Sequence, residues 1–372
     1  MTAPATRPLP ASPPRVRRRR ARTAGRRLLS VCGALVLAAL ALVLVLAAAV
    51  SSPLWLLAGQ RWRPLRFAVY LLVHLLADLT GAAAAGLVRL RCLLDVDPDR
   101  RRERMRALDY ALLGQLLAFL HGAAVLVFGL RVTVHPEIPA ATGPASADQQ
   151  PQGGGGGVVV LARHAGPGDS ILLVHALLRQ AGLRPQVVLK DFLRWDPCLD
   201  VLISRLPHCF VPIESDERTT AEIGALAAAL GPRDALVLFP EGGNFTPGRR
   251  QRAIAWLRRN GQFRRAARAR REHHVLPPRL PGSLAALEGA AASGSDVVFV
   301  AHTGLDRLDS PRRLWRSVPL PAPVRAAWWR VAASDIPKEP QSRTEWLTEQ
   351  WSSVDEWIAR VWERTDDAWT ES

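Results

Sequence analysis

The sequence has few of the residues, and none of the short motifs, on which several functional classes depend. Its four cysteines form neither a C-x-x-C pair nor a zinc-ligand spacing, which excludes a small secreted scaffold held by disulfides. We expect these cysteines to be small buried apolar residues. Only two of the 49 basic residues are lysine, an arginine bias to which we give no functional weight.

Two catalytic motifs are missing as well. No G-x-S-x-G segment occurs, so the sequence does not encode the strained turn that exposes a nucleophilic serine. Five glycines at 153–157 resemble a phosphate loop, but no Gly-Lys-Ser/Thr follows to supply the charge and the metal ligand. We interpret residues 139–157, rich in Pro, Ala, Gln and Gly, as a flexible loop.

The composition is that of a folded protein with an excess of positive charge. The chain has 372 residues, of which 48% are hydrophobic, and a formal net charge of +16. This hydrophobic content excludes a disordered protein, because burial of so much apolar surface can offset the entropy of the chain. The length fits one large domain or two ordinary ones.

The N-terminal region predicts a membrane anchor. Residues 1–27, which we expect to be disordered, carry nine arginines and no acid, and residues 28–50 are uncharged. At about 1.5 Å per residue, such a helix crosses a hydrocarbon core of roughly 30 Å. A cleavable signal peptide is the alternative, but its apolar part spans only about 7–15 residues. The arginines place the N-terminus in the cytoplasm; a nucleic-acid arm is a weaker interpretation, since it has no reason to adjoin a bilayer-length segment.

Two further apolar stretches complete a membrane-anchoring region over residues 28–130. The stretch at 65–90 carries His74 and Asp78, and arginines follow it. It predicts either a helix that returns to the cytoplasm or one that lies in the membrane interface. Polar residues interrupt the stretch at 107–130 as well, so we favour an interfacial or protein-packed helix over a spanning one.

From residue 131 onward the pattern predicts an α/β fold with a mixed, mostly parallel sheet flanked by helices. Alternating strands and helices imply a sheet covered on both faces. We assign residues 131–335 to this domain and 336–372 to a C-terminal amphipathic helix whose apolar residues recur at steps of three and four. The expected strands lie at 131–135, 158–162, 186–189, 235–239 and 296–301, and the expected helices at 170–181 and 221–230.

The loop after the strand at 158–162 places a histidine and a carboxylate five positions apart, at His164 and Asp169. The Gly-Pro-Gly turn between them can fold Asp169 back onto the imidazole. The carboxylate would then fix the tautomer while the other ring nitrogen accepts a proton. The spacing alone has a plainer interpretation, in which Asp169 only caps the next helix.

A second loop makes the combination specific. The strand at 235–239 ends in Phe-Pro followed by Glu241, Gly242 and Gly243. This combination resembles the glycerophospholipid acyltransferase superfamily of membrane enzymes, in which one strand is followed by H-x-x-x-x-D and a later strand by F-P-E-G. The resemblance implies that His164 and Asp169 are catalytic, and that Glu241, Gly242 and Gly243 help to bind the acceptor.

Further segments extend the resemblance over residues 130–365. Lys190, in Lys-Asp-Phe-Leu, is similar to the lead into the family's second motif. Pro277, in His-Val-Leu-Pro-Pro-Arg, is similar to the fourth motif, a strand ending in proline. The resemblance implies that both belong to the substrate site. The spacing is most similar to the branch that includes lysocardiolipin and lysophosphatidylinositol acyltransferases.

The chain departs from the family pattern where the acceptor phosphate is bound. Many members have Thr and Arg after E-G, whereas Gly243 and Asn244 stand here. The usual arginine of the second motif is also missing from the corresponding strand. We count Asn244 among the substrate-binding residues, and predict that Arg249 and Arg250, or Arg218, supply the guanidinium for bidentate phosphate contacts.

The motifs together predict a membrane-bound O-acyltransferase of the 1-acylglycerol-3-phosphate acyltransferase type. It would move an acyl group from acyl-CoA or acyl carrier protein to the hydroxyl of a lysophospholipid. His164 would act as general base, since an imidazole pKa of about 6.5 suits that role, and N–H groups of the 166–170 turn would stabilise the oxyanion. We expect no metal or redox cofactor, no nucleic-acid partner, and a catalytic domain on the cytoplasmic side of the cell membrane. The alternative is a catalytically inactive membrane protein that binds lipid or nucleic acid.

Residues 249–271 hold ten arginines and no acid, with Ile254, Trp256, Leu257 and Phe263 among them. As one helix, this pattern gives an apolar stripe with a cationic surround, typical of a helix on anionic lipid. A solvated structural helix is the alternative. A segment that binds nucleic acid would carry a similar positive charge, but the aromatic residues and the upstream anchor favour binding to lipid.

Overall fold

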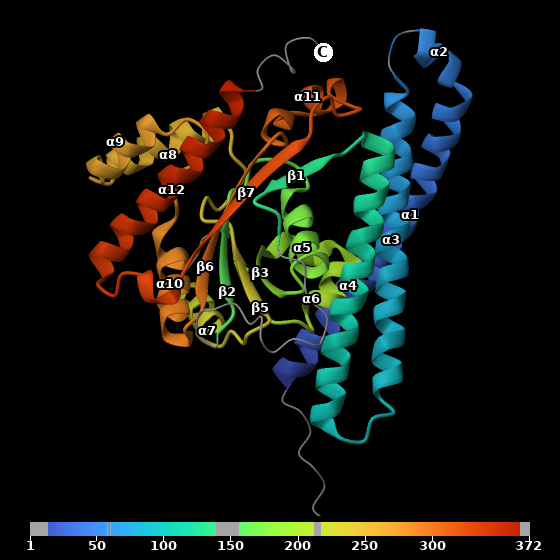
Figure 1. Cartoon of the computed structure of the whole chain (residues 1–372). Coiled ribbons are helices and arrows are strands. Elements are labelled where there is room, and N and C mark those ends of the chain that lie inside the picture. Colours follow the sequence, from blue (N-terminus) through green and yellow to red (C-terminus); the bar gives the residue numbers. More distant parts are fainter. Residues whose placement is uncertain (1–13, 58, 60, 139–155, 212–216, 365–372) are drawn as a thin grey trace, which may run out of the picture.

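A seven-stranded sheet forms the centre of the protein. The computed structural model describes residues 14–57, 59, 61–138, 156–211 and 217–364. The strand order is β1-β7-β6-β2-β5-β3-β4 (Figure 1). Only the β6–β7 pair is antiparallel among these strands. The mixed, mostly parallel sheet flanked by helices confirms the predicted fold class.

Most strands lie where the apolar runs predict them. The strands are β1 (Val132–His135), β2 (Val158–Ala162), β3 (Arg184–Lys190), β4 (His208–Val211), β5 (Asp234–Leu238), β6 (Asp296–Thr303) and β7 (Val324–Val331). The sequence pattern does not predict β7, because arginines interrupt its apolar run. The expected strand at 274–278 is wrong. This segment is a loop, because its carbonyl and N–H groups bind side chains instead of a neighbouring strand.

Helices cover both faces of the sheet (Figure 1). On one face lie α7 (Glu217–Ala228), α10 (Leu280–Ser293) and α12 (Pro340–Glu363), and on the other lies α5 (Asp169–Arg179). Along β2, Val159 and Leu161 pack towards the first group, while Val158 and Val160 pack towards α5. α12 docks on the sheet by a buried apolar stripe that includes Trp351 and Ile358.

Four helices precede the sheet: α1 (Pro14–Val50), α2 (Ser52–Leu57), α3 (Arg63–Cys92) and α4 (Pro98–Phe128). α1 begins at Pro14, so residues 14–27 are helical rather than disordered, whereas residues 1–13 lie outside the described part. By length and composition, residues 25–50, α3 and α4 could each cross a membrane. The expected loop at 139–157 falls almost wholly outside the described residues.

The N-terminal helices pack against the α/β domain instead of standing apart from it (Figure 1). In α4, Asp109 and Tyr110 are buried, and the Tyr110 hydroxyl donates to the Pro185 carbonyl at 3.2 Å. Arg26 and Arg27 of α1 each lie 2.6 Å from a carboxylate oxygen of Asp200. Asp200 belongs to α6 (Pro197–Ile203), so α1 is fastened to the domain.

The arginine-rich segment forms two helices, not one. α8 (Pro247–Arg259) and α9 (Phe263–Arg271) meet at a turn in which Gly261 has a φ of +70°. That left-handed backbone conformation suits glycine and breaks the helix. The remaining elements are η2 (Asp191–Trp195), η3 (Asp306–Leu308), α11 (Pro311–Arg316) and η4 (Ala333–Asp335). Three cysteines are buried as expected, whereas Cys32 is exposed on α1.

Candidate active site

The loop between β2 and α5 brings His164 and Asp169 together as predicted. His164 Nδ1 lies 2.9 Å from Asp169 Oδ2 and 3.0 Å from Oδ1. Gly168, with a φ of +83°, allows the sharp turn that returns the carboxylate to the ring. Nδ1 is therefore the nitrogen held by the carboxylate, and Nε2 is the ring atom left for a proton transfer.

Asp169 is fixed by backbone donors as well as by the imidazole. Its carboxylate accepts the N–H groups of Ala165 at 2.8 Å, Gly166 at 3.2 Å and Ser170 at 2.6 Å. Asp169 does not cap α5, because the N-cap residue is Gly168 and no side chain caps the helix. The N–H groups of Gly166 and Ser170 are consumed here, so they cannot serve the expected oxyanion site.

The charge state of Asp169 follows from its surroundings. Burial would raise its pKa, but the hydrogen bond with His164 and the nearby His302 hold the pKa below its ordinary value. The carboxylate is therefore ionised at neutral pH, which keeps the proton on Nδ1 of His164 and the lone pair on Nε2.

A buried network that the sequence analysis misses supports this pair. Arg163, directly before His164, donates to the carbonyls of His274 at 3.0 Å and His302 at 2.7 Å, and to Asp306 Oδ2 at 3.0 Å. His302 Nε2 in turn lies 2.9 Å from the Arg163 carbonyl and 3.7 Å from Asp169 Oδ2. The sequence does show that His302 directly follows the apolar strand expected at 296–301, whereas the pairing of that strand with β2 is seen only in the structure.

Glu241 lies under the catalytic loop, not on its surface. It is buried, and its Oε1 accepts the N–H of Leu276 at 3.2 Å. Burial raises the pKa of Glu241 to about 8, against the lowering effects of Arg163 and of the Leu276 N–H. In this position the carboxyl group joins the loop after β5 to the loop at 272–279. That Glu241 helps to bind the acceptor stays a prediction.

Gly242 and Gly243 form a cradle for three cations. A methyl group on Gly243 would lie 2.9 Å from Arg249 Nη1 and 3.6 Å from Lys190 Nζ. A methyl group on Gly242, whose φ is +65°, would lie 2.5 Å from Arg279 Nε. Partial burial lowers the pKa of Lys190, and so do the charges of Arg249 and Arg279. Three crowded cations favour an anion among them.

The two neighbouring arginines predicted for phosphate binding have different positions. Arg249 folds back over the loop and donates to the Asn244 carbonyl at 3.0 Å, so Asn244 fixes the arginine through its backbone. Arg250 instead donates to three carbonyls at the end of α9. The structure thus places Arg250 outside the cradle, where it joins the start of α8 to the end of α9.

Pro277 lies in the loop at 272–279, half buried beside the cradle. Its neighbour Leu276 binds Glu241, and two residues further on the Arg279 N–H donates to the Pro240 carbonyl at 2.8 Å. Pro277 therefore shapes the segment that delivers Arg279. Arg279 is the last residue of the fourth motif, and the motif alone does not predict its place beside Gly242.

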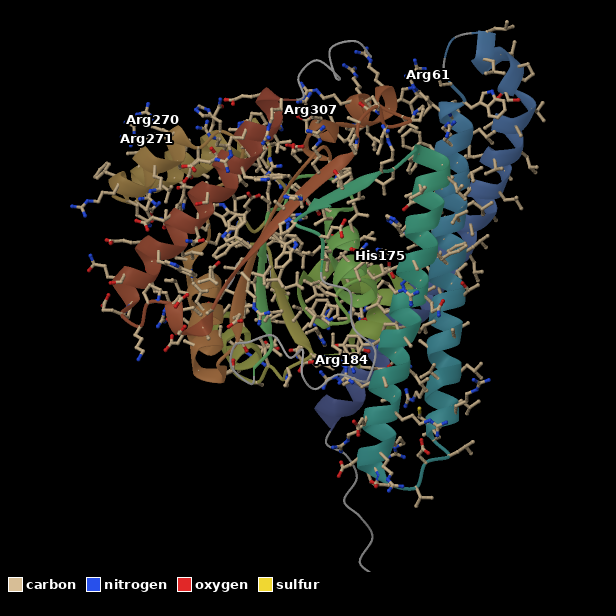
Figure 2. The ribbon with its side chains drawn as sticks, viewed as in Figure 1. Arg61, His175, Arg184, Arg270, Arg271 and Arg307 are labelled. Carbon is tan, nitrogen blue, oxygen red and sulfur yellow. The ribbon has the colours of Figure 1, made fainter. Side chains whose placement is uncertain are left out.

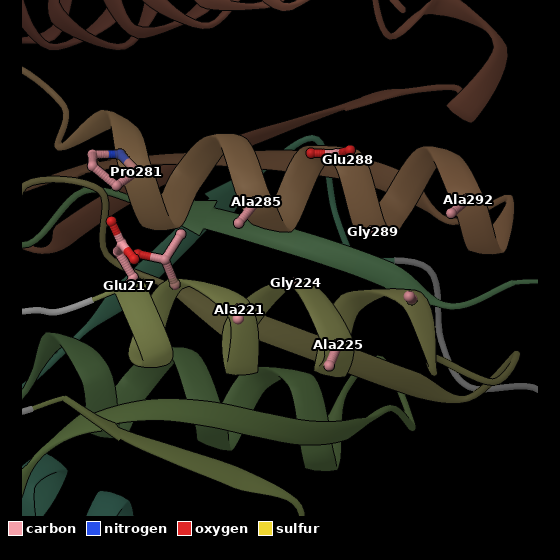
Figure 3. A pocket seen from close by; sticks show the side chains of 11 residues that line it. Glu217, Ala221, Gly224, Ala225, Pro281, Ala285, Glu288, Gly289 and Ala292 are labelled. Atoms are coloured by element: carbon pink, nitrogen blue, oxygen red, sulfur yellow. The ribbon is translucent and has the colours of Figure 1, made fainter.

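A groove of about 690 Å³ lies elsewhere, between α7 and α10 (Figure 3). It is lined by small residues such as Ala221 and Ala285, with Glu217 and Glu288 at its border. No residue of the His164 loop or of the Glu241 loop lines it. The groove is therefore not the site of the chemistry described above.

Comparison with known proteins assigns the domain. Residues 131–280 match the Acyltransferase family, and this range contains His164, Asp169 and Glu241. No curated protein matches the chain. One similar solved structure is the crystal structure of the 1-acyl-sn-glycerophosphate (LPA) acyltransferase PlsC from Thermotoga maritima. It is 18% identical, the match covers 79% of this chain and 98% of that chain, and the TM-score is 0.45. The family match covers the part of the chain that holds the candidate site, and it supports assignment of these residues to the acyltransferases of the glycerophospholipid acyltransferase superfamily.

Proposed function

We propose that the protein transfers an acyl group from acyl-CoA or acyl carrier protein to the free hydroxyl of a lysophospholipid. The acceptor is 1-acyl-sn-glycerol-3-phosphate or a related lysophospholipid. The observation that carries the proposal is the His164–Asp169 pair. The Phe245 N–H donates to the His164 carbonyl at 2.7 Å and so joins the catalytic loop to the segment that bears the cradle. The acyl donor is a co-substrate in this proposal, and no further cofactor takes part.

The proposed reaction is a direct transfer with a general base. His164 Nε2 takes the proton of the acceptor hydroxyl while the hydroxyl oxygen attacks the thioester carbonyl. Collapse of the tetrahedral intermediate breaks the C–S bond, and the imidazolium returns the proton to the leaving thiolate. Gly168 and Asp169 have N–H groups with no acceptor among the described residues, so we assign the oxyanion to them.

The cation cradle supplies the contact with the acceptor phosphate. Lys190, Arg249 and Arg279 surround Gly242 and Gly243 and belong to three different segments. A charge-assisted bond to phosphate is worth about 1.5–3 kcal/mol. Arg249 and Arg279 therefore replace the arginines that the family pattern has elsewhere, and a bound phosphate would relieve the repulsion that lowers the pKa of Lys190.

The test uses the purified full-length chain in detergent. Labelled acyl-CoA and labelled acyl carrier protein are offered with a panel of lysophospholipids, and the products are separated by chromatography. We expect transfer by the wild type, none by His164→Ala, and normal transfer by His273→Ala, which removes an exposed histidine. Substantial activity in His164→Ala would overturn the mechanism. A wild type that transfers nothing would favour the catalytically inactive alternative.

We further propose that the protein is integral to the cell membrane with its catalytic domain on the cytoplasmic side. Three helices that could cross a membrane support the anchoring, and the site needs a donor that occurs in the cytoplasm. Reporter fusions after residue 372, combined with protease access in intact cells, measure the side directly. A fusion exposed outside the cell would contradict the proposal and the choice of donor.

A further inference from the structure

The α8–α9 hairpin (residues 247–271) is a separate small unit with its own apolar core. Leu257 packs against Ala266 and Ala269, and Ile254 covers them. Arg250 fastens the start of α8 to the end of α9 through three carbonyls. These contacts hold the two helices together, and Arg265 adds a bond to the Pro278 carbonyl at 2.6 Å.

The arginines of the hairpin are not paired with carboxylates in the part of the chain that the structure describes. The hairpin's ten arginines include none that forms an ion pair among the residues that the structure describes. The segment contains no acid, and the next acid along the chain, Glu272, is buried. Besides Arg249, the exposed arginines are Arg252, Arg258, Arg259, Arg264, Arg270 and Arg271. Such a field attracts a large anionic surface.

Two aromatic side chains stand among these arginines. Trp256 is 51% exposed and Phe263 is 68% exposed, and they lie on either side of the turn at Gly261. Neither belongs to the apolar core of the hairpin. Exposed Trp and Phe beside arginine match the interface of a bilayer, where an aromatic ring enters the headgroup region and a guanidinium binds phosphate.

The hairpin lies at the catalytic edge of the sheet. α8 follows the carboxyl end of β5, as His164 follows the carboxyl end of β2. Figure 2 shows Arg270 and Arg271 at the outer end of this edge, with Arg307 and Arg61 further along it. The basic and aromatic side chains of the hairpin therefore lie beside the candidate site.

We propose that the α8–α9 hairpin docks on the surface of an anionic phospholipid bilayer. Its arginines bind lipid phosphates, and Trp256 and Phe263 enter the headgroup region. This docking would hold the catalytic edge against the bilayer, so that the hydroxyl of an embedded lysolipid reaches His164. The inference deepens the proposed function and rests on it, since only a lipid acceptor requires this orientation. Charge complementarity identifies the partner as anionic lipid.

The experiment follows two labelled positions in the full-length chain with Cys32→Ser, because the other cysteines are buried. Ala267→Cys lies one helical turn after Phe263 on the same side of α9, and Ala229→Cys lies at the opposite edge of the sheet. Both are exposed alanines and carry the same environment-sensitive fluorophore. The protein is reconstituted into phosphatidylcholine vesicles with or without 30 mol% phosphatidylglycerol, a composition of about one anionic lipid in three.

We expect the label at Ala267 to shift to the blue and to lose access to iodide only in the anionic vesicles. The label at Ala229 should stay accessible in both. An arginine near such a surface changes partitioning roughly fivefold, so Arg258→Gln, Arg259→Gln and Arg264→Gln together should reduce docking about a hundredfold. The matched control removes three exposed arginines at the other end of the molecule, Arg100, Arg102 and Arg104, and should leave the signal unchanged.

Three outcomes would overturn the proposal. In the first, iodide reaches the label at Ala267 equally well with and without anionic vesicles. In the second, neutral phosphatidylcholine vesicles protect this label from iodide as well as anionic vesicles do. In the third, an acidic carrier protein protects the label in detergent, where no bilayer is present. The last result would assign the surface to a protein partner. Acyl transfer to a detergent-dissolved acceptor is measured in parallel. If the protein transfers the acyl group but the hairpin does not dock, only the docking proposal is contradicted. If the hairpin docks but no acyl group is transferred, only the proposed function is contradicted.

Discussion

Arg163 and Asp306 form an ion pair from which water is excluded beneath the catalytic loop. Arg163 Nη1 lies 3.0 Å from Asp306 Oδ2, and the two side chains are 0% and 2% exposed. Burial would raise the pKa of Asp306, but the Arg163 guanidinium holds it below its ordinary value. The same guanidinium binds the carbonyls of His274 and His302, so one side chain joins three segments at the site.

We predict that Arg163→Met destabilises the protein by about 3–5 kcal/mol, because it leaves a buried carboxylate without a counter-charge. Arg163→Lys should recover only part of the loss, since an ammonium group lacks the planar fork that reaches three acceptors. Thermal unfolding in detergent measures both. The double variant Arg163→Met, Asp306→Leu is the control and should be more stable than Arg163→Met alone. A single variant that unfolds at the wild-type temperature would contradict the prediction.

Asp169→Asn should lower kcat by roughly four orders of magnitude, as expected when a catalytic imidazole takes the wrong tautomer. The side chain keeps its size, and with its oxygen at the Oδ2 position Asn still accepts the N–H groups of Ala165 and Gly166, whereas the Ser170 N–H loses its acceptor. The acceptor KM should therefore change little, while the unfolding temperature falls. Steady-state kinetics with circular dichroism separate these effects. A decrease in kcat of less than tenfold would show that Asp169 does not control the tautomer.

Glu241 should make the protein less stable at alkaline pH. Its pKa is about 8 in the folded state against 4.5 for the free group. The folded state therefore binds the proton more tightly, and the resulting stability is complete below about 4.5 and is lost as pH rises through about 8. Glu241→Gln stays neutral, so its unfolding temperature should fall less than that of the wild type between pH 6 and pH 9. Parallel profiles for the two proteins would contradict the assignment.

Arg249 and Arg250 offer a matched pair of substitutions. Arg249→Gln should raise the acceptor KM by about tenfold to a hundredfold, the value of one charge-assisted bond, with little effect on the donor KM. Arg250→Gln should leave both KM values unchanged and lower the unfolding temperature, because three carbonyls lose their donor. A higher donor KM in Arg249→Gln would instead assign the cradle to the phosphates of CoA.

Apolar runs and the spacing of residues within one loop were enough to predict the central strands and the His164–Asp169 pair. β2, β5 and β6 are continuous apolar runs because both faces of a central strand are buried, and the turn at Gly168 keeps His164 and Asp169 close within one loop. Such features depend on neighbours in sequence, and the sequence shows them directly.

The partners of that pair come from distant segments and could not be predicted in the same way. His302 and Asp306 reach Arg163 only because β6 lies beside β2, a fact of strand order. The role of Glu241 depended on burial, since the motif alone does not show that the Leu276 loop covers the carboxyl group. The different positions of Arg249 and Arg250 could not be predicted either. Arg250 reaches the end of α9 only because the turn at Gly261 folds α9 back along α8.

The fastening of α1 and α4 to the domain has a practical consequence for producing it. A fragment that starts at residue 131 would expose the apolar cluster of Val174, Cys198 and Leu202, which Leu113 and Leu117 of α4 now cover. It would also leave the buried carboxylate of Asp200 without Arg26 and Arg27. Removing the helices to obtain a soluble enzyme should therefore yield aggregates, and detergent is needed for the fold as much as for the membrane segments.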